Sequence, residues 1–181
     1  MPSVRATRRF LLALLAIALS AAASPATAGS LSRGTAAFHR GDYIRAFREL
    51  SPLAERENPT ALGLLGFMYE HGFGAPQAYD AAADLYGRAA VQGNPFAQAM
   101  LGLMYDKGHG VPQDFVLAYK WLNLAAARTD GRERDAYARF RNAVASKMST
   151  DEIAIGQRLA LNWSPAFPAS AVRPLIVSPS H

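Results

Sequence analysis

The sequence of 181 residues contains no cysteine. No disulfide can therefore hold the fold, no lipid can be attached through a thiol, and a zinc site with cysteine ligands is excluded. Whatever stabilises the protein must come from packing, capping and hydrogen bonds.

Recognisable catalytic motifs are also missing. No lysine follows a serine in the S-x-x-K pattern, and neither G-x-S-x-G nor H-E-x-x-H occurs. His71 and His109 lie in or beside predicted loops and form no His-x-x-x-His pair, so we interpret them as solvated side chains. The sequence predicts no catalytic residue, no metal site and no bound cofactor.

Charged residues are few, at 18%, and half of the residues are apolar, which is typical of a globular chain that buries a core. The net charge of +5 comes from 19 basic and 14 acidic residues. Three of the basic residues, Arg5, Arg8 and Arg9, lie near the N-terminus. Without them the balance is 16 minus 14, or +2, which gives little support to nucleic-acid binding.

The N-terminus has the pattern of a secretory signal peptide over residues 1–28. The three arginines precede an apolar run from Phe10 to Leu19, which is followed by small residues and the Ala26-Thr27-Ala28 cleavage pattern. We expect cleavage after Ala28, with Ala23 as an alternative, and delivery to the periplasm by the general secretory route. The apolar run is shorter than the roughly 20 residues of a membrane-spanning helix; a retained anchor is the alternative interpretation.

The central feature of the sequence is a repeat. Residues 61–82, ALGLLGFMYEHGFGAPQAYDAA, recur 36 positions later at residues 97–118 as AQAMLGLMYDKGHGVPQDFVLA, with ten identical positions. A period of this length predicts stacked helix pairs that share one elongated core.

Each repeat carries its own boundary signals. Asn58-Pro59 and Asn94-Pro95 predict the capped start of a first helix, helix A, which should end before Gly72 or Gly108. Helix B is then expected over 79–91 and 115–127, and Asp114 should cap the second of these, whereas its counterpart is Ala78. The residues expected to form the core face are Ala61, Leu65, Met68, Tyr69, Ala82, Leu85, Ala89 and Ala90, and their partners 36 positions later.

Gly66 and Gly102 lie in the middle of helix A, where glycine costs about 1 kcal/mol relative to alanine. We interpret them as points where the partner helix approaches too closely for a Cβ atom.

The pattern AxxxLGxMYxxGxGxPQxxxxA, present twice and followed by paired alanines, resembles the SEL-one-like repeat (SLR) family, a subgroup of the tetratricopeptide superfamily. The resemblance covers 59–94 and 95–130 closely and 31–57 loosely. Within the loosely matching part, the apolar spacing predicts helices over residues 31–40 and 43–57. It implies an all-α, right-handed solenoid of antiparallel helix pairs with about eight helices. It also implies an exported adaptor or regulator that acts through protein contacts.

Beyond the repeats the pattern changes. Residues 131–163 keep helical spacing, with a capping box at Ser149 and Glu152, and predict a C-terminal capping pair of helices. Its expected apolar faces include Phe140, Ile155 and Leu159. Residues 164–181 contain four prolines and no acidic residue, and we interpret them as a disordered tail.

The resemblance also indicates where a partner would bind. Helix A positions that are not used by the core line the concave surface of tetratricopeptide-like stacks. Here the predicted partner-binding residues, with apolar side chains rimmed by acidic ones, are Thr60, Phe67, Glu70, Phe96, Leu103 and Asp106. The alternative is that curvature and neighbouring helices cover these side chains.

A second surface is suggested by basic residues near the C-terminal cap, namely Arg128, Arg132, Arg139 and Arg141. They could contact anionic lipid headgroups or an acidic partner, or simply form a solvated helix face. For the whole chain we expect a non-enzymatic interaction module. The alternatives are a hydrolase of cell-envelope substrates such as β-lactams or peptidoglycan, and a structural factor at the cell wall or membrane surface.

Overall fold

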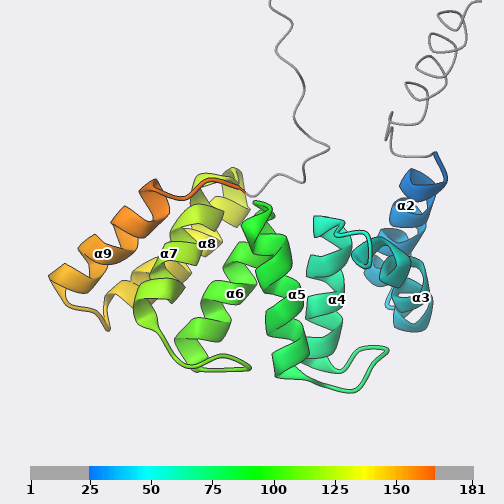
Figure 1. Cartoon of the computed structure of the whole chain (residues 1–181), viewed down its shortest axis with the longest axis horizontal. Helices are drawn as coiled ribbons and strands as arrows, with labels where there is room; N and C mark the ends of the chain where they lie inside the picture. Colours follow the sequence, from blue (N-terminus) through cyan, green and yellow to red (C-terminus); the bar gives the residue numbers. More distant parts are fainter. Residues whose placement is uncertain (1–24, 166–181) are drawn as a thin grey trace, which may run out of the picture.

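The computed structural model describes residues 25–165. The secondary structure of this part of the chain consists of helices joined by loops. Figure 1 shows α2 and α3 at one end, α4, α5 and α6 following in chain order, and α7 packed between α8 and α9 at the other end. The eight helices are α2 (Pro25–His39), α3 (Tyr43–Ala54), α4 (Pro59–His71), α5 (Tyr79–Val91), α6 (Pro95–Lys107), α7 (Phe115–Ala127), α8 (Gly131–Ala145) and α9 (Thr150–Leu161).

The signal peptide prediction falls mostly on residues 1–24, and the tail prediction mostly on 166–181; both segments lie outside the described residues. Within 25–165, no helix is long and apolar enough to cross a membrane.

The caps are those that the sequence predicts. Asn58 and Asn94 each accept backbone N–H bonds at the start of helix A, and Pro59 and Pro95 occupy the first helical turn. Gly72 and Gly108 end these helices in the left-handed conformation. Both B helices span the predicted residues.

Outside the repeats some boundaries differ from the predictions. Helix α2 begins at Pro25 rather than Leu31. Helix α3 ends at Ala54 rather than Glu57, because Glu57 takes a positive φ of 60° and the Asn58 amide donates back to the Leu53 carbonyl. This left-handed residue turns the chain into α4.

Close approach at glycine holds each helix pair together, as predicted. A Cβ atom on Gly66 would lie 2.8 Å from the ring of Tyr86, which is fully buried. One on Gly102 would lie 2.8 Å from Leu122 and 3.1 Å from the Ala118 carbonyl oxygen. The helical spacing does not place Tyr86 in the core, whereas Leu85, which it does place there, is only half-buried.

The first helix pair uses the same device. A Cβ atom on Gly34 in α2 would lie 2.7 Å from Leu50 in α3. Leu50, Tyr86 and Leu122 are spaced 36 residues apart. Residues 31–54 are therefore built like the two repeats, with a shorter loop between the helices.

The loops between helices A and B join successive pairs. The second glycine of each loop, Gly74 or Gly110, lies against the backbone at the start of the preceding B helix, and a Cβ atom on Gly74 would be 2.9 Å from the Tyr43 carbonyl oxygen. Phe73 stacks on the Tyr43 ring with centroids 4.5 Å apart, and His109 packs against the Tyr79 ring at 4.8 Å. Figure 1 shows the α4–α5 and α6–α7 loops along the same edge of the array.

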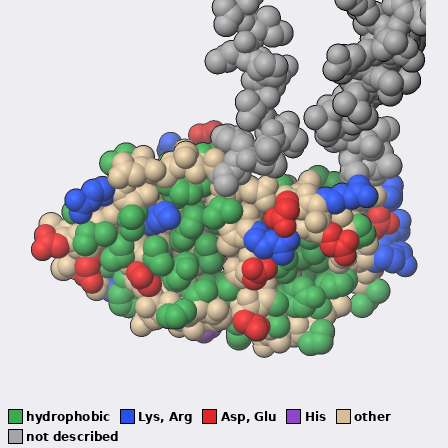
Figure 2. All heavy atoms as spheres, viewed as in Figure 1, with side chains coloured by type: hydrophobic (Ala, Val, Ile, Leu, Met, Phe, Trp, Pro, Cys, Tyr) green, Lys and Arg blue, Asp and Glu red, His purple; other side chains and the backbone are tan. Residues whose placement is uncertain are grey.

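The C-terminal helices do not form a simple pair. Both α8 and α9 pack on α7, and they contact each other far less than they contact α7. Gly156 of α9 lies where a Cβ atom would be 2.9 Å from the Tyr119 ring of α7. The predicted apolar faces are accordingly only partly covered: Phe140, Ile155 and Leu159 are each 40–42% exposed. In Figure 2, hydrophobic side chains gather over α7 and α9.

Two glycines test the close approach of the helices. We expect Gly102→Ala to lower the free energy of unfolding by roughly 1 to 2 kcal/mol, because the clash with buried atoms outweighs the gain in helix propensity. Gly87 lies inside α5, where an added Cβ atom would have no neighbour within 4 Å, so Gly87→Ala should raise it by up to about 1 kcal/mol. Urea denaturation of both variants measures the difference; equal effects would contradict the interpretation.

The two B helices test the effect of capping. Asp114 accepts from the Leu117 amide, whereas Ala78 has nearly the same backbone angles and no side-chain cap. Replacing Ala78 with Asp should therefore stabilise the protein by about 1 kcal/mol, and Asp114→Ala should cost a similar amount. Chemical denaturation of the two variants checks the opposite signs. A destabilised Ala78→Asp protein would show that the missing cap does not limit α5.

Candidate partner-binding surface

The A helices line the inner side of the array. We count α2 and α8 with the A helices α4 and α6, because they occupy the equivalent places in the array. Successive A helices approach one another, α2 with α4, α4 with α6 and α6 with α8, whereas α3, α5 and α7 have fewer contacts among themselves. The array therefore curves with the A helices inside. We call this side the inner face, and it is the side on which the sequence predicts the partner-binding residues.

Aromatic rings form a row across the inner face. Phe67 in α4 lies between Phe38 in α2, at a centroid distance of 5.6 Å, and Phe96 in α6, at 6.2 Å. His71 stacks on Phe67 at 4.1 Å, and its Nδ1 atom lies 3.0 Å from the Phe67 carbonyl oxygen. The three phenylalanines are half-buried and His71 is exposed. We call Phe38, Phe67 and Phe96 the aromatic row.

Neighbouring helices partly cover the predicted binding residues, which is the alternative considered from the sequence. Phe96 packs over Gly63, where a Cβ atom would be 3.4 Å from its ring, and near Tyr86. Leu103, the counterpart of Phe67, is half-buried against the cluster that includes Val144 of α8. Thr60 at the start of α4 is exposed. Phe67, Phe96 and Leu103 thus contribute to packing and also keep some exposed surface.

The two acidic residues are both engaged within the fold. Tyr86 donates its hydroxyl proton to the Glu70 carboxylate at 2.9 Å, and burial together with the Glu70 charge raises the pKa of Tyr86 well above its ordinary value. Asp106 forms an ion pair with Lys147 at 2.7 Å and is largely shielded from solvent. The Glu70–Tyr86 hydrogen bond joins α4 to α5. The Asp106–Lys147 ion pair joins α6 to the segment that follows α8. The two carboxylates do not form a free acidic rim.

The repeat glutamines brace the same helix ends. Gln77 donates to the Glu70 carbonyl and Gln113 to the Asp106 carbonyl, each at 2.7 Å. Because carbonyls near the end of a helix lack intrahelical partners, these bonds satisfy them and fix the loop beneath.

The predicted basic group is divided among different surroundings. Arg128 lies over the Trp163 ring at 4.5 Å, and Arg132 and Arg139 are exposed. Arg141 instead extends from α8 toward α7 and donates to the Asn123 side-chain oxygen at 2.9 Å.

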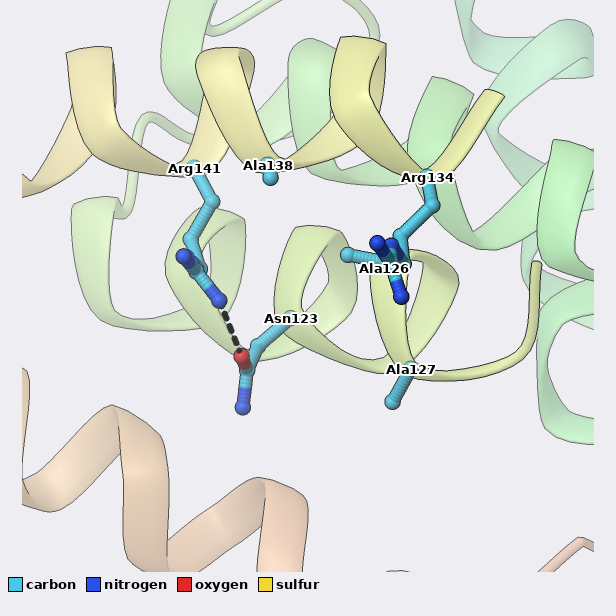
Figure 3. A pocket seen from close by; sticks show the side chains of 6 residues that line it. All are labelled: Asn123, Ala126, Ala127, Arg134, Ala138 and Arg141. Atoms are coloured by element: carbon cyan, nitrogen blue, oxygen red, sulfur yellow. Dashed lines mark hydrogen bonds between the residues drawn. The ribbon is translucent and has the colours of Figure 1, made fainter. Parts of the chain in front are cut away.

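Arg141 belongs to a pocket that the sequence does not predict. The pocket has a volume of about 280 Å³ and lies between α7 and α8 (Figure 3). Its lining residues are Asn123, Ala126, Ala127, Arg134, Ala138 and Arg141. The available signal was two arginines seven residues apart on one helix with an alanine between them. Only the fold shows that α7 lies opposite.

Titratable groups do not assemble into a metal site: across residues 25–165, no three His, Asp or Glu side chains are placed to hold a metal ion.

The repeat region matches a known family. The Sel1 repeat family model matches residues 59–94 and 95–130. The chain carries two Sel1 repeats. Sel1 repeats are in general protein-interaction modules, and the fold is typically a non-catalytic scaffold. A search of curated proteins gives no match for this chain.

Two solved structures share the fold. The protein is similar to c5321, a protective antigen of uropathogenic Escherichia coli strains with an SLR fold, at a TM-score of 0.67 and 23% identity over 74% of this chain. It is also similar to a Sel1 repeat protein from Oxalobacter formigenes, at 0.58 and 27% over 72%. The chain spans 29% and 54% of those proteins' lengths, so the likeness concerns the SLR solenoid.

Proposed function

We propose that this Sel1 repeat protein is an exported, non-enzymatic adaptor that binds a segment of another protein on its inner face. The observation that carries the proposal is the aromatic row, which continues from α2 through α4 to α6 as one strip of partly exposed rings. Sel1 repeats provide the general support, because they are protein-interaction modules.

The aromatic row has the chemistry of a binding surface for apolar side chains. Phenylalanine rings provide much contact area, and here each ring is held by its neighbours, so little conformational freedom is lost on binding. Exposed Thr60 and His71 lie on the same helix as Phe67 and offer polar contacts beside it. A partner segment with apolar side chains along one side fits this arrangement.

Glu70 and Asp106 do not determine which partner segment the inner face binds. Glu70 and Asp106 already have partners, Tyr86 and Lys147, so binding a cation there would first require these contacts to break. We therefore assign the recognition chiefly to the rings and to the polar groups beside them.

Residues 1–28 support export to the periplasm through their charged, apolar and small-residue segments. Helix α2 begins at Pro25, so cleavage after Ala23 would leave the whole helix in the mature protein, whereas cleavage after Ala28 would remove its first turn. Cleavage after Ala23 therefore preserves more of the structure.

Export has a direct test. When the full chain is expressed in a bacterium with an outer membrane, we expect it in the periplasmic fraction with a mature N-terminus at Ser24 or Gly29. N-terminal sequencing and fractionation measure both. Recovery in the membrane pellet with the first residues intact would instead show a retained anchor.

The inner face is tested with two exposed positions, because Phe67 packs against several rings and its loss would also destabilise the fold. We expect the double variant Thr60→Glu and His71→Glu to lose partners that the unmodified protein captures from the cell-envelope fraction, since the new charges would be desolvated on binding. Quantitative affinity capture measures the loss.

The matched control is Ile44→Glu with Val91→Glu, which adds the same number of charges at exposed positions on α3 and α5. Its capture should be unchanged. Because His71→Glu also removes the stacking on Phe67, melting curves must show that both double variants are folded at the temperature of the capture experiment. Equal capture by the inner-face variant and the parent protein would show that the inner face is not the binding surface.

A further inference from the structure

The pocket between α7 and α8 has two cationic ends and an alanine floor. Figure 3 shows Arg134 and Arg141 extending from α8 toward α7 on either side of Ala138, with Asn123, Ala126 and Ala127 opposite them. It lies on a different part of the molecule from the aromatic row and does not depend on the inner face.

Arg141 has no acidic partner, and Arg134 has only a long, exposed ion pair. Arg141 donates only to the side-chain oxygens of Asn123, at 2.9 Å, and Asn142, at 3.0 and 3.2 Å, and both amides are uncharged. In the described part of the chain no carboxylate lies within 4 Å of Arg141, and Arg134 has only its exposed neighbour Asp135, at 3.9 Å. Because an exposed pair of this kind is weak, the Arg134 charge is accessible to a ligand, and so is the charge of Arg141.

The position of Arg134 near the start of α8 favours a bound anion. It lies at the beginning of α8, where the helix dipole is positive and repels a cation. Glu133 in the first turn offsets part of this repulsion, whereas Asp130, the residue before the helix, makes no side-chain capping bond. A bound carboxylate would compensate both the side-chain charge and the positive end of the helix.

Arg141 is already oriented for binding. Its bonds to Asn123 and Asn142 hold the guanidinium group in the pocket, and a fixed planar group binds a carboxylate with less entropic cost than a mobile one. The pocket volume of about 280 Å³ lies just below the range of roughly 300 to 1,000 Å³ that is typical of small-molecule sites. It is therefore suited to one or two side chains rather than to a cofactor.

We propose that this pocket binds an acidic segment of a partner protein, with one carboxylate on Arg134 and a second on Arg141. The two arginines are seven residues apart, which places their Cα atoms about 10 Å apart along the helix. In a polyproline II segment, residues three apart lie on the same side at about 9 Å, so two acidic residues with two residues between them match the spacing. The two residues between them point away from the pocket, so the peptide backbone passes over the alanine floor.

The inward direction of the two guanidinium groups favours a peptide over a membrane surface. A lipid bilayer requires cations that project outward together, whereas Arg134 and Arg141 both line a recess between two helices, although the Arg134 side chain is also 59% exposed. The outward-facing arginines of α8, Arg132 and Arg139, lie outside this lining.

The test uses the protein from residue 24 onward and the blocked peptide Gly-Glu-Pro-Ala-Glu-Gly, followed by NMR of the Asn123 side-chain amide and the arginine Nε–H signals. We expect saturable shifts at Asn123 and Arg141. The peptide with both Glu replaced by Gln should bind at least about tenfold more weakly, because each charge-assisted hydrogen bond contributes this much.

Variants of α8 supply the matched control. Arg134→Gln and Arg141→Gln should each weaken peptide binding by about tenfold, whereas Arg139→Gln, which removes the same charge outside the pocket, should change it less than about twofold. Arg141→Lys keeps the charge without the planar group and should also weaken binding. Arg134 has no structural partner across the pocket, so its variant remains informative if Arg141→Gln unfolds.

Three results would overturn the proposal: no shift at Asn123 with the acidic peptide, equal losses for Arg139→Gln and Arg134→Gln, or stronger binding to phosphatidylglycerol vesicles or to inorganic phosphate than to the peptide at the same anion concentration. The first would show that the peptide does not enter the pocket, the second a nonspecific charge effect, and the last a preference for phosphate groups.

Discussion

The structure depends on the contact between the second glycine of each loop and the backbone at the start of the preceding B helix. A helix pair of about thirty residues cannot bury its apolar face alone, so each pair is stable only against its neighbours. Gly74 on Tyr43 and Gly110 on Tyr79 fix where the next pair lies, and the rings of Phe73 and His109 extend the contact. The curvature of the array and the aromatic row follow from this repeated placement.

Local signals made most of the repeat predictable from the sequence. The caps at Asn94 and Asp114 and the left-handed residue at Gly108 depend on groups within one turn of the helix, and they form where the sequence places them. The close approach at Gly102 was also predictable, because a glycine in the middle of a helix needs a structural reason.

Contacts between distant elements were not predictable in the same way. Periodicity shows which face of a helix is apolar, but it does not show which helix will cover that face. Phe140 and Leu159 have the right spacing for a core, yet they remain about 40% exposed because α8 and α9 both pack on α7. Likewise, the sequence alone gives Asp106 no partner. In the structure, Lys147, which follows α8, lies 2.7 Å from its carboxylate.

The positions Tyr43, Tyr79 and Phe115 form a series with the 36-residue period, one at the start of each B helix. A glycine loop covers the first two, whereas at Phe115 the ammonium group of Lys147 lies 5.4 Å from the ring centre. The two ends of the array therefore differ from its interior, whereas both junctions inside the described array use the same glycine contact. If one repeat were duplicated between residues 94 and 95, its glycine loop would contact the aromatic residue of the preceding B helix. Its own aromatic residue would be covered by the glycine loop of the repeat that follows. Such an array can change its length by internal duplication while both of its ends stay the same.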